Sequence, residues 1–293
     1  MKKAPFEGVA TALITPFKED GSIDFDGLGI LIENQIENGV SAIVIAGTTG
    51  EASTLSFAEF SLLISKANEY IGHRIPLIVG TGSNNTAKAL KFSLEAQKRG
   101  ADGILMVTPY YNKTTQDGLI RHYYHIADRV NIPIILYNIP SRAGIKIMPQ
   151  TCKKLFEHPN IVAIKEASGD ISATMDIIAK TPDLILYSGN DDQFLPMLSI
   201  GAKGVISVAS NVFPREIVNI YQHFKKGNLE KAMQAHYHLL PLMRALFHEV
   251  NPIPVKKALQ IMNMPSGDPR LPLISCSRET EELIIKTIKE AGL

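Results

Sequence analysis

The chain has 293 residues, of which 45% are hydrophobic and 20% are charged, as in a folded globular protein with one large core or two domains. Its formal net charge is +1, from 30 basic and 29 acidic residues mixed along the sequence. This balance gives no electrostatic footprint for nucleic acid or an anionic membrane, so small molecules are the expected partners.

Short apolar runs alternate with segments of helical periodicity as far as about residue 227. The runs are continuously apolar, which is typical of parallel strands covered on both faces. They span 9–14, 42–46, 77–80, 103–107, 134–137, 161–165, 184–187 and 204–208. The helical segments include 25–37, 57–71, 86–99, 116–130, 171–180, 191–200 and 214–226. Eight such units predict a (β/α)8 TIM barrel rather than a doubly wound sheet, which typically has five or six strands.

From about residue 228 the pattern is helical, with expected helices over 229–250, 255–262 and 278–291 and no strand candidate. We therefore expect two domains, a catalytic barrel over 1–227 and a C-terminal helical domain over 228–293.

The two cysteines, Cys152 and Cys276, lie far apart and have no companion histidine at metal-ligand spacing. Neither a disulfide framework nor a zinc site is indicated, and no metal is expected. The basic start lacks the apolar stretch of a secretory signal, and no apolar run approaches the roughly 18 residues of a membrane span. These features predict a cytoplasmic protein that does not enter the membrane.

Lys165 stands at the end of the sixth apolar run, where a strand should enter a packed core. Burial lowers the pKa of a lysine, and the neutral amine is a nucleophile toward carbonyl substrates. The alternative is a structural lysine that extends to solvent or pairs with Glu166. In a TIM barrel the chemistry sits at the C-terminal ends of the strands, so Lys165 is expected in the barrel mouth.

Other polar residues also follow the expected strands. Tyr137 ends the fifth run, beside Lys165, but its usual pKa of about 10 would require coupling to hydroxyls such as Thr48 and Tyr111. Taken alone, Tyr137 is better explained as an aromatic side chain that fills the barrel top. The turn 47–51 offers N–H groups and hydroxyls to a carboxylate or phosphate. Arg142 is suited to a second carboxylate, or is an exposed loop arginine.

At these residues the chain closely resembles the dihydrodipicolinate synthase family, also called 4-hydroxy-tetrahydrodipicolinate synthase, within the pyruvate-dependent class I aldolases and lyases. The resemblance covers essentially the full length, and the motifs together are highly specific. They are Gly47-Thr48-Thr49-Gly50-Glu51, Pro109-Tyr110-Tyr111-Asn112, Tyr137-Asn138-Ile139-Pro140-Ser141-Arg142, Ile164-Lys165-Glu166-Ala167, Gly204-Val205-Ile206-Ser207 and Asn251-Pro252-Ile253-Pro254-Val255-Lys256.

The resemblance implies the reaction and a role for each site residue. The enzyme would condense pyruvate with L-aspartate 4-semialdehyde, toward diaminopimelate and lysine, with a covalent Schiff base in place of any cofactor. Lys165 would form that Schiff base, and Tyr137, Thr48 and Tyr111 would relay protons. Thr49 and the backbone near Ile206 would hold the pyruvate carboxylate, Gly189 would line the pocket, and Arg142 would bind the carboxylate of the second substrate.

The resemblance also implies a homo-oligomer, usually a dimer of two tight dimers, in which Tyr111 reaches the active site of a neighbouring subunit. Two other functions stay open. One is a sibling aldolase that cleaves a sugar acid to pyruvate, although Arg142 favours the synthase because the siblings typically lack arginine in this loop. The other is a barrel that binds a metabolite without covalent chemistry, with Lys165 paired to Glu166.

One departure from the family concerns regulation. Lysine-inhibited members place histidines soon after the Gly-Glu turn and a glutamate on the following helix. The matching positions here are Phe57, Phe60 and Lys88. Because Lys88 would repel the ammonium group of the effector, we expect weak or absent inhibition by lysine.

Overall fold

A computed structural model describes residues 2–292 and, within them, a closed barrel of eight parallel strands in sequence order. This confirms the TIM barrel predicted from the sequence. The strands are β1 (Gly8–Ala12), β2 (Ala42–Ile45), β3 (Leu77–Gly80), β4 (Gly103–Val107), β5 (Ile134–Asn138), β6 (Ile161–Glu166), β7 (Ile185–Ser188) and β8 (Gly204–Ser207).

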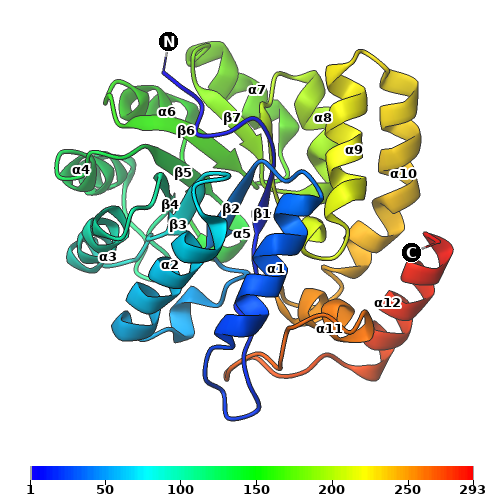
Figure 1. The fold of residues 1–293 in the computed structure, drawn as a ribbon. Coiled ribbons are helices and arrows are strands. Elements are labelled where there is room, and N and C mark those ends of the chain that lie inside the picture. The colour runs from blue at the N-terminus through cyan, green and yellow to red at the C-terminus, as the bar shows by residue number, and fades with distance from the viewer. Residues whose placement is uncertain (1, 293) are drawn as a thin grey trace.

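Helices surround the barrel; all but the last of them link successive strands, and α9 follows β8 (Figure 1). They are α1 (Phe25–Glu37), α2 (Phe57–Ile71), α3 (Thr86–Lys98), α4 (Gln116–Ala127), α6 (Pro149–Phe156), α7 (Ile171–Lys180), α8 (Phe194–Ser199) and α9 (Pro214–Lys225). Shorter turns of helix follow the C-terminal ends of four strands: η1 (Ala52–Thr54), α5 (Pro140–Ala143), η2 (Asp191–Gln193) and η3 (Ala209–Asn211). These short turns belong to the loops that shape the barrel mouth.

Several helices begin at side-chain caps in the loops that follow the strands. Ser56 and Glu59 form a capping box at the start of α2, where each side chain accepts a hydrogen bond from the backbone N–H of the other residue. Asp170 accepts from the N–H of Ala173 at the start of α7. Such caps satisfy N–H groups that lack partners within the helix, and so fix where each loop ends.

Strand residues alternate between two cores. The outer core lies between the sheet and the helices, and it includes Val79, Met106 and Ile164. The inner core fills the barrel and contains many small side chains, among them Ala42 and Ala163. Side chains of consecutive residues in a strand point to opposite faces, so each strand serves both cores.

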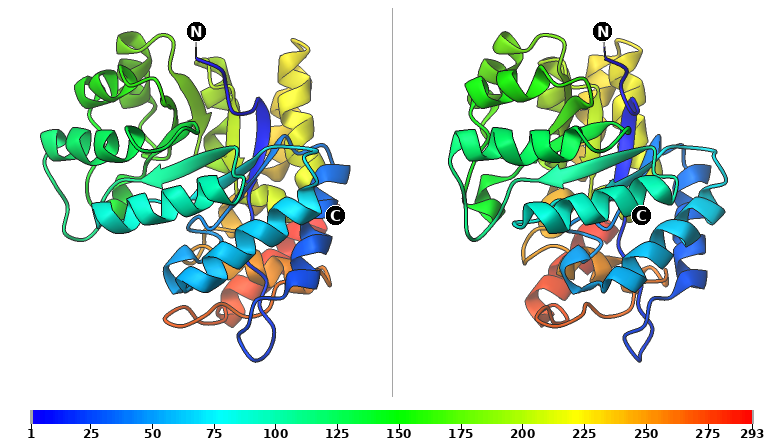
Figure 2. Two further views of the ribbon diagram at one scale, coloured as in Figure 1. Left: turned by 60° about the vertical axis from the view of Figure 1, so that its left-hand side comes forward. Right: turned by 90° about the vertical axis from the view of Figure 1, so that its left-hand side faces the viewer.

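The C-terminal helices α10 (Leu229–Ala245), α11 (Ile253–Ile261) and α12 (Arg278–Glu290) pack together, and α10 lies against α9. Leu242 and Val255 belong to the same apolar cluster as the outer core of the barrel. The orange and red segment that holds α11 and α12 lies at the opposite end of the molecule from the N-terminus (Figure 2). The division of the chain into domains at residues 227 and 228 stays a prediction.

The structure also corrects several expected elements. No single helix spans 191–200, because η2 precedes α8 and the Asp191 side chain accepts hydrogen bonds from the N–H groups of Val208 and Ala209. The expected helix over 229–250 ends at Ala245, and the chain then turns toward the barrel mouth. The sequence periodicity predicted no helix between β5 and β6, where the structure has α5 and α6. No helix within residues 2–292 is long and apolar enough to span a bilayer.

Candidate active site

Lys165 and Tyr137 lie side by side near the C-terminal ends of β6 and β5. They are partners in the register between the two strands, so their side chains share the inner face of the barrel. The Lys165 Nζ lies 4.5 Å from the centroid of the Tyr137 ring. The exposed fractions of the two residues are only 4% and 7%. The sequence prediction that these two residues would be neighbours is confirmed.

Burial changes the chemistry of Lys165. It lowers the pKa of the Lys165 ammonium from 10.5 to about 8, and the nearby positive charge of Arg142 acts in the same direction. The negative charge of Asp191 opposes the shift. A fraction of the amine is therefore neutral and nucleophilic near neutral pH.

Glu166 does not pair with Lys165. Its Oε2 accepts a hydrogen bond from the Asn138 Nδ2 at 2.7 Å, and its Oε1 accepts from the Ser168 N–H at 2.7 Å. Glu166 points to the outer face of β6 because it directly follows Lys165 in the strand. The structural alternative, in which Lys165 is paired with Glu166, is therefore wrong.

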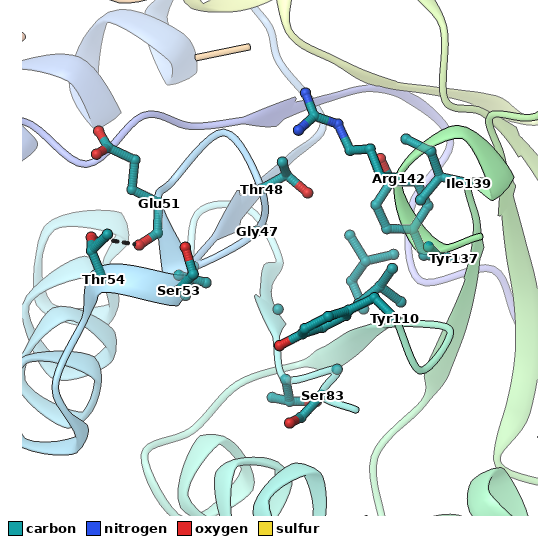
Figure 3. A pocket seen from close by; sticks show the side chains of 18 of the residues that line it. Gly47, Thr48, Glu51, Ser53, Thr54, Ser83, Tyr110, Tyr137, Ile139 and Arg142 are labelled. Atoms are coloured by element: carbon teal, nitrogen blue, oxygen red, sulfur yellow. Dashed lines mark hydrogen bonds between the residues drawn. The ribbon is translucent and has the colours of Figure 1, made fainter. Parts of the chain in front are cut away.

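Tyr137 is coupled to two other predicted site residues. Burial raises the pKa of the Tyr137 phenol to about 12, while the positive charge of Arg142 and the nearby Thr48 side chain lower it. Arg142 is exposed on α5 and extends toward the turn that carries Thr48 (Figure 3). Tyr137, Thr48 and Arg142 line a cavity of about 300 Å³. Lys165 is not among the described residues that line it, and instead contacts the Tyr137 ring.

Gly189 leaves room for the Lys165 side chain. A Cβ atom at this position would lie 3.1 Å from the Lys165 Cε and 2.5 Å from the Ala167 Cβ. Ile206 is fully buried in the inner core, where it is paired with Ala10 across β1 and β8. The structure thus brings Gly189 to Lys165 and places the Ile206 side chain inside the barrel.

Tyr111 differs from the other predicted site residues. It is 90% exposed, and its backbone φ of 69° lies in the left-handed region that residues other than glycine rarely adopt. The preceding Tyr110 lines the cavity. Within one chain, Tyr111 therefore lies in solvent and not beside Lys165.

Asn251 is a site residue to which sequence reasoning gave no role. Its Nδ2 donates a hydrogen bond to the Thr49 Oγ1 at 3.0 Å, and its carbonyl oxygen accepts one from the Arg142 Nη2 at 3.2 Å. Its Oδ1 is buried and has no hydrogen-bond partner in the described part of the chain. The motif that begins at Asn251 was the available signal, but the sequence does not show which loop it would meet.

Glu51 and Lys256 form a second contact between the same regions that sequence reasoning missed. Their side chains are each 1% exposed and approach to 2.6 Å. Glu51 also accepts a hydrogen bond from the Arg270 N–H at 2.8 Å. This ion pair fixes the end of the turn 47–51 to α11, and with it the positions of Thr48 and Thr49.

The described range 2–292 contains no group of three or more His, Cys, Asp or Glu side chains with metal-binding geometry. The sequence prediction that no metal takes part is not tested by this observation.

Comparisons with known proteins agree with this geometry. The sequence model of the Dihydrodipicolinate synthetase family matches residues 5–291. The chain belongs to this family. A 4-hydroxy-tetrahydrodipicolinate synthase from Caldicellulosiruptor saccharolyticus is 49% identical, over 98% of each chain. One from Methanococcus maripaludis is 45% identical, over 98% of this chain and 99% of its own.

Solved structures of family members have the same fold. The dihydrodipicolinate synthase from Thermotoga maritima superposes with a TM-score of 0.96 at 44% identity, over 99% of each chain. The enzyme from Cyanidioschyzon merolae, solved with lysine bound, has a TM-score of 0.96 at 42% identity, over 99% of this chain and all of its own. The family resemblance seen in the sequence motifs is thus confirmed over nearly the whole chain.

Proposed function

We propose that this chain is a 4-hydroxy-tetrahydrodipicolinate synthase, which condenses pyruvate with L-aspartate 4-semialdehyde in lysine and diaminopimelate biosynthesis. The observation that carries the proposal is the environment of Lys165. Its side chain is buried, its pKa is lowered, and it packs against the Tyr137 ring in a chain that belongs to this family. An amine of this kind is the nucleophile that Schiff-base chemistry requires.

In the first step the neutral Lys165 amine adds to the ketone carbon of pyruvate. The resulting carbinolamine loses water to give an iminium, which needs a group that donates and then recovers a proton. Tyr137 would serve as this shuttle, and the nearby Thr48 hydroxyl would offer a path for the proton. Thr49, the backbone near Ile206 and the space beside Gly189 would receive the pyruvate carboxylate.

In the second step the iminium loses a proton from its methyl group, and the enamine carbon attacks the aldehyde of the second substrate. Arg142 would hold the carboxylate of that substrate, for which its planar guanidinium is suited. The amine of the adduct then displaces Lys165 and closes a six-membered ring, which frees the lysine for another turnover. These proposed reaction steps need no cofactor or metal.

We infer a homo-oligomer, most simply a dimer of two tight dimers, in which Tyr111 completes the proton relay of a neighbouring subunit. The support is the exposure of Tyr111 and its left-handed backbone beside the cavity residue Tyr110. We also infer a cytoplasmic location, in keeping with the unpaired Cys152 and Cys276.

Borohydride trapping followed by substrate competition tests the function. Reduction with pyruvate present should give a stable adduct that peptide mass spectrometry maps to Lys165, and Lys165→Ala should give none. Turnover with L-aspartate 4-semialdehyde should exceed turnover with N-acetylneuraminate or 2-keto-3-deoxygluconate. A missing adduct would exclude covalent catalysis, and preferred cleavage of a sugar acid would assign the chain to a sibling activity.

A further inference from the structure

The loop that carries Arg142 is closed at its neck by one side chain. This loop leaves β5 at Asn138, passes through α5 and returns at Ile147, before α6. The Asn138 Oδ1 accepts a hydrogen bond from the Ile147 N–H at 2.9 Å. Asn138 is only 3% exposed, so water does not compete freely for this bond. The two ends of the Arg142 loop are therefore joined through a buried amide.

Glu166 determines how that amide is oriented. Asn138 and Glu166 are register partners in β5 and β6, and the Asn138 Nδ2 donates to the Glu166 Oε2 at 2.7 Å. Because the carboxylate holds the side-chain NH₂ group of Asn138, the side-chain oxygen Oδ1 must face Ile147. The Glu166 Oε1 accepts from the Ser168 N–H, and the Glu166 backbone carbonyl oxygen accepts from the Gly189 N–H at 2.7 Å. Glu166 thus ties together the loops after three strands.

The chemical requirement at position 166 is strict. Both side-chain partners of Glu166 are N–H donors, so the residue must offer two acceptor oxygens in a site where it is 4% exposed. A carboxylate offers two, whereas a glutamine amide offers one and turns a donor toward a donor. A buried donor left without an acceptor is costly.

We propose that Glu166 is a positioning residue for the second substrate: through Asn138 it holds the neck of the Arg142 loop, and so sets where the Arg142 guanidinium meets the carboxylate. This inference rests on the proposed synthase function. It assigns the two sides of β6 to different tasks, since Lys165 on the inner face bonds to pyruvate and Glu166 on the outer face places the group that selects its partner.

Glu166→Gln tests the proposal through separate kinetic constants. We expect the KM for L-aspartate 4-semialdehyde to rise roughly tenfold or more, the scale for a hydrogen bond to a buried charge. The KM for pyruvate and the borohydride trapping at Lys165 should change less than about threefold, a shift of under 1 kcal/mol. Glu157→Gln is the control, because Glu157 is exposed and pairs with Lys154 on the surface.

The double variant Asn138→Asp/Glu166→Gln is the rescue. The glutamine NH₂ group then donates to one oxygen of the introduced aspartate, whose other oxygen accepts from Ile147, while the glutamine oxygen accepts from Ser168. All three hydrogen bonds and the single negative charge are restored. We expect Asn138→Asp alone to be impaired, because it sets two carboxylates against each other, and the double variant to approach the wild-type KM for the second substrate.

Two results would overturn the inference. One is a Glu166→Gln enzyme with an unchanged KM for the semialdehyde. The other is a double variant that stays as impaired as the single variants. This second criterion holds even if the single variants fail to fold. A wild-type enzyme that forms the pyruvate adduct but does not condense it with the semialdehyde would instead overturn the proposed function.

Discussion

At the scale of single residues, the environment of Lys165 determines the pH at which the site can begin its reaction. With a pKa near 8, about a tenth of the amine is neutral at pH 7, compared with less than a thousandth for an ordinary lysine. Protonation removes the lone pair with which Lys165 would attack the ketone in the proposed mechanism. Acid should therefore switch the first step off, and alkali should switch it on.

The rate of pyruvate-dependent borohydride trapping should follow this titration. We expect the rate to rise with pH, with a midpoint near 8, and to fall about tenfold for each pH unit well below the midpoint. Single-time-point trapping across a pH series, read by intact mass, measures it. A midpoint near 10.5 would mean that Lys165 is accessible to water in solution.

Asn251 should act on one substrate and not on the other. Asn251→Ala removes the donor to Thr49, so the KM for pyruvate should rise about fivefold, the scale of one hydrogen bond of roughly 1 kcal/mol. The backbone carbonyl that holds Arg142 is retained, so the KM for the semialdehyde serves as an internal control. Steady-state kinetics in both substrates would show the split, and an equal rise in both KM values would count against it.

At the scale of elements, apolar runs predict strands well because a parallel strand buries both of its faces. The eight barrel strands and the pairing of Tyr137 with Lys165 follow from this pattern. Contacts between distant segments do not follow, because nothing local distinguishes a lysine that will meet a buried glutamate. Glu51 and Lys256 are of this kind, as is the contact between Asn251 and Thr49. The family resemblance identified the motifs, but it did not predict which motifs contact one another in the folded chain.

The buried Glu51–Lys256 pair should be sensitive to the loss of one partner. Lys256→Met leaves the Glu51 carboxylate buried and unpaired, at a cost of about 3–5 kcal/mol in the free energy of unfolding. Adding Glu51→Gln to that variant should recover part of the loss. Urea unfolding measures both effects.

The neighbouring residue supplies the matched control for this experiment. Lys257→Met removes an ion pair with Glu281 at 3.6 Å near the surface, which should cost no more than about 1 kcal/mol. Equal losses for the two lysine variants would show that Glu51 is not isolated by burial.

At the scale of the whole molecule, the cavity extends from Thr48 and Tyr137 to α2 and α3, where regulation is expected to act. Phe60 and Lys88 both line it. The Phe92 ring packs against Phe57 and Phe60, and the Lys88 Nζ lies 5.5 Å from the centroid of the Phe92 ring. These four residues offer no carboxylate to an incoming ammonium group, and Glu51, which also lines the cavity, is already paired with Lys256.

Lysine should therefore inhibit this enzyme weakly or not at all. We expect no inhibition at sub-millimolar lysine in steady-state assays of the purified enzyme. Lys88→Glu, which replaces repulsion by attraction, should increase any inhibition that remains. Strong inhibition of the wild-type enzyme would show that lysine binds without a carboxylate at this position.

The proposed exchange of Tyr111 between subunits can be tested with mixed oligomers. Lys165→Ala and Tyr111→Phe should each lose most activity when pure. Co-refolded hybrids should regain part of it, because one site of a mixed dimer would combine an intact Lys165 with an intact Tyr111. Activity of the mixture equal to the average of the pure variants would mean that each chain completes its own site.

The adjacency of Lys165 and Glu166 also bears on how such enzymes diversify. A strand presents alternate residues to separate environments, so mutations on the outer side of β6 can alter the Arg142 loop while the inner side is conserved by selection for the pyruvate adduct. A change of aldehyde acceptor would then be accessible through substitutions that leave Lys165 unchanged. A one-residue insertion or deletion in β6, in contrast, would exchange the two sides and abolish both tasks at once. We therefore expect related lineages to vary in the loop and to keep the length of this strand.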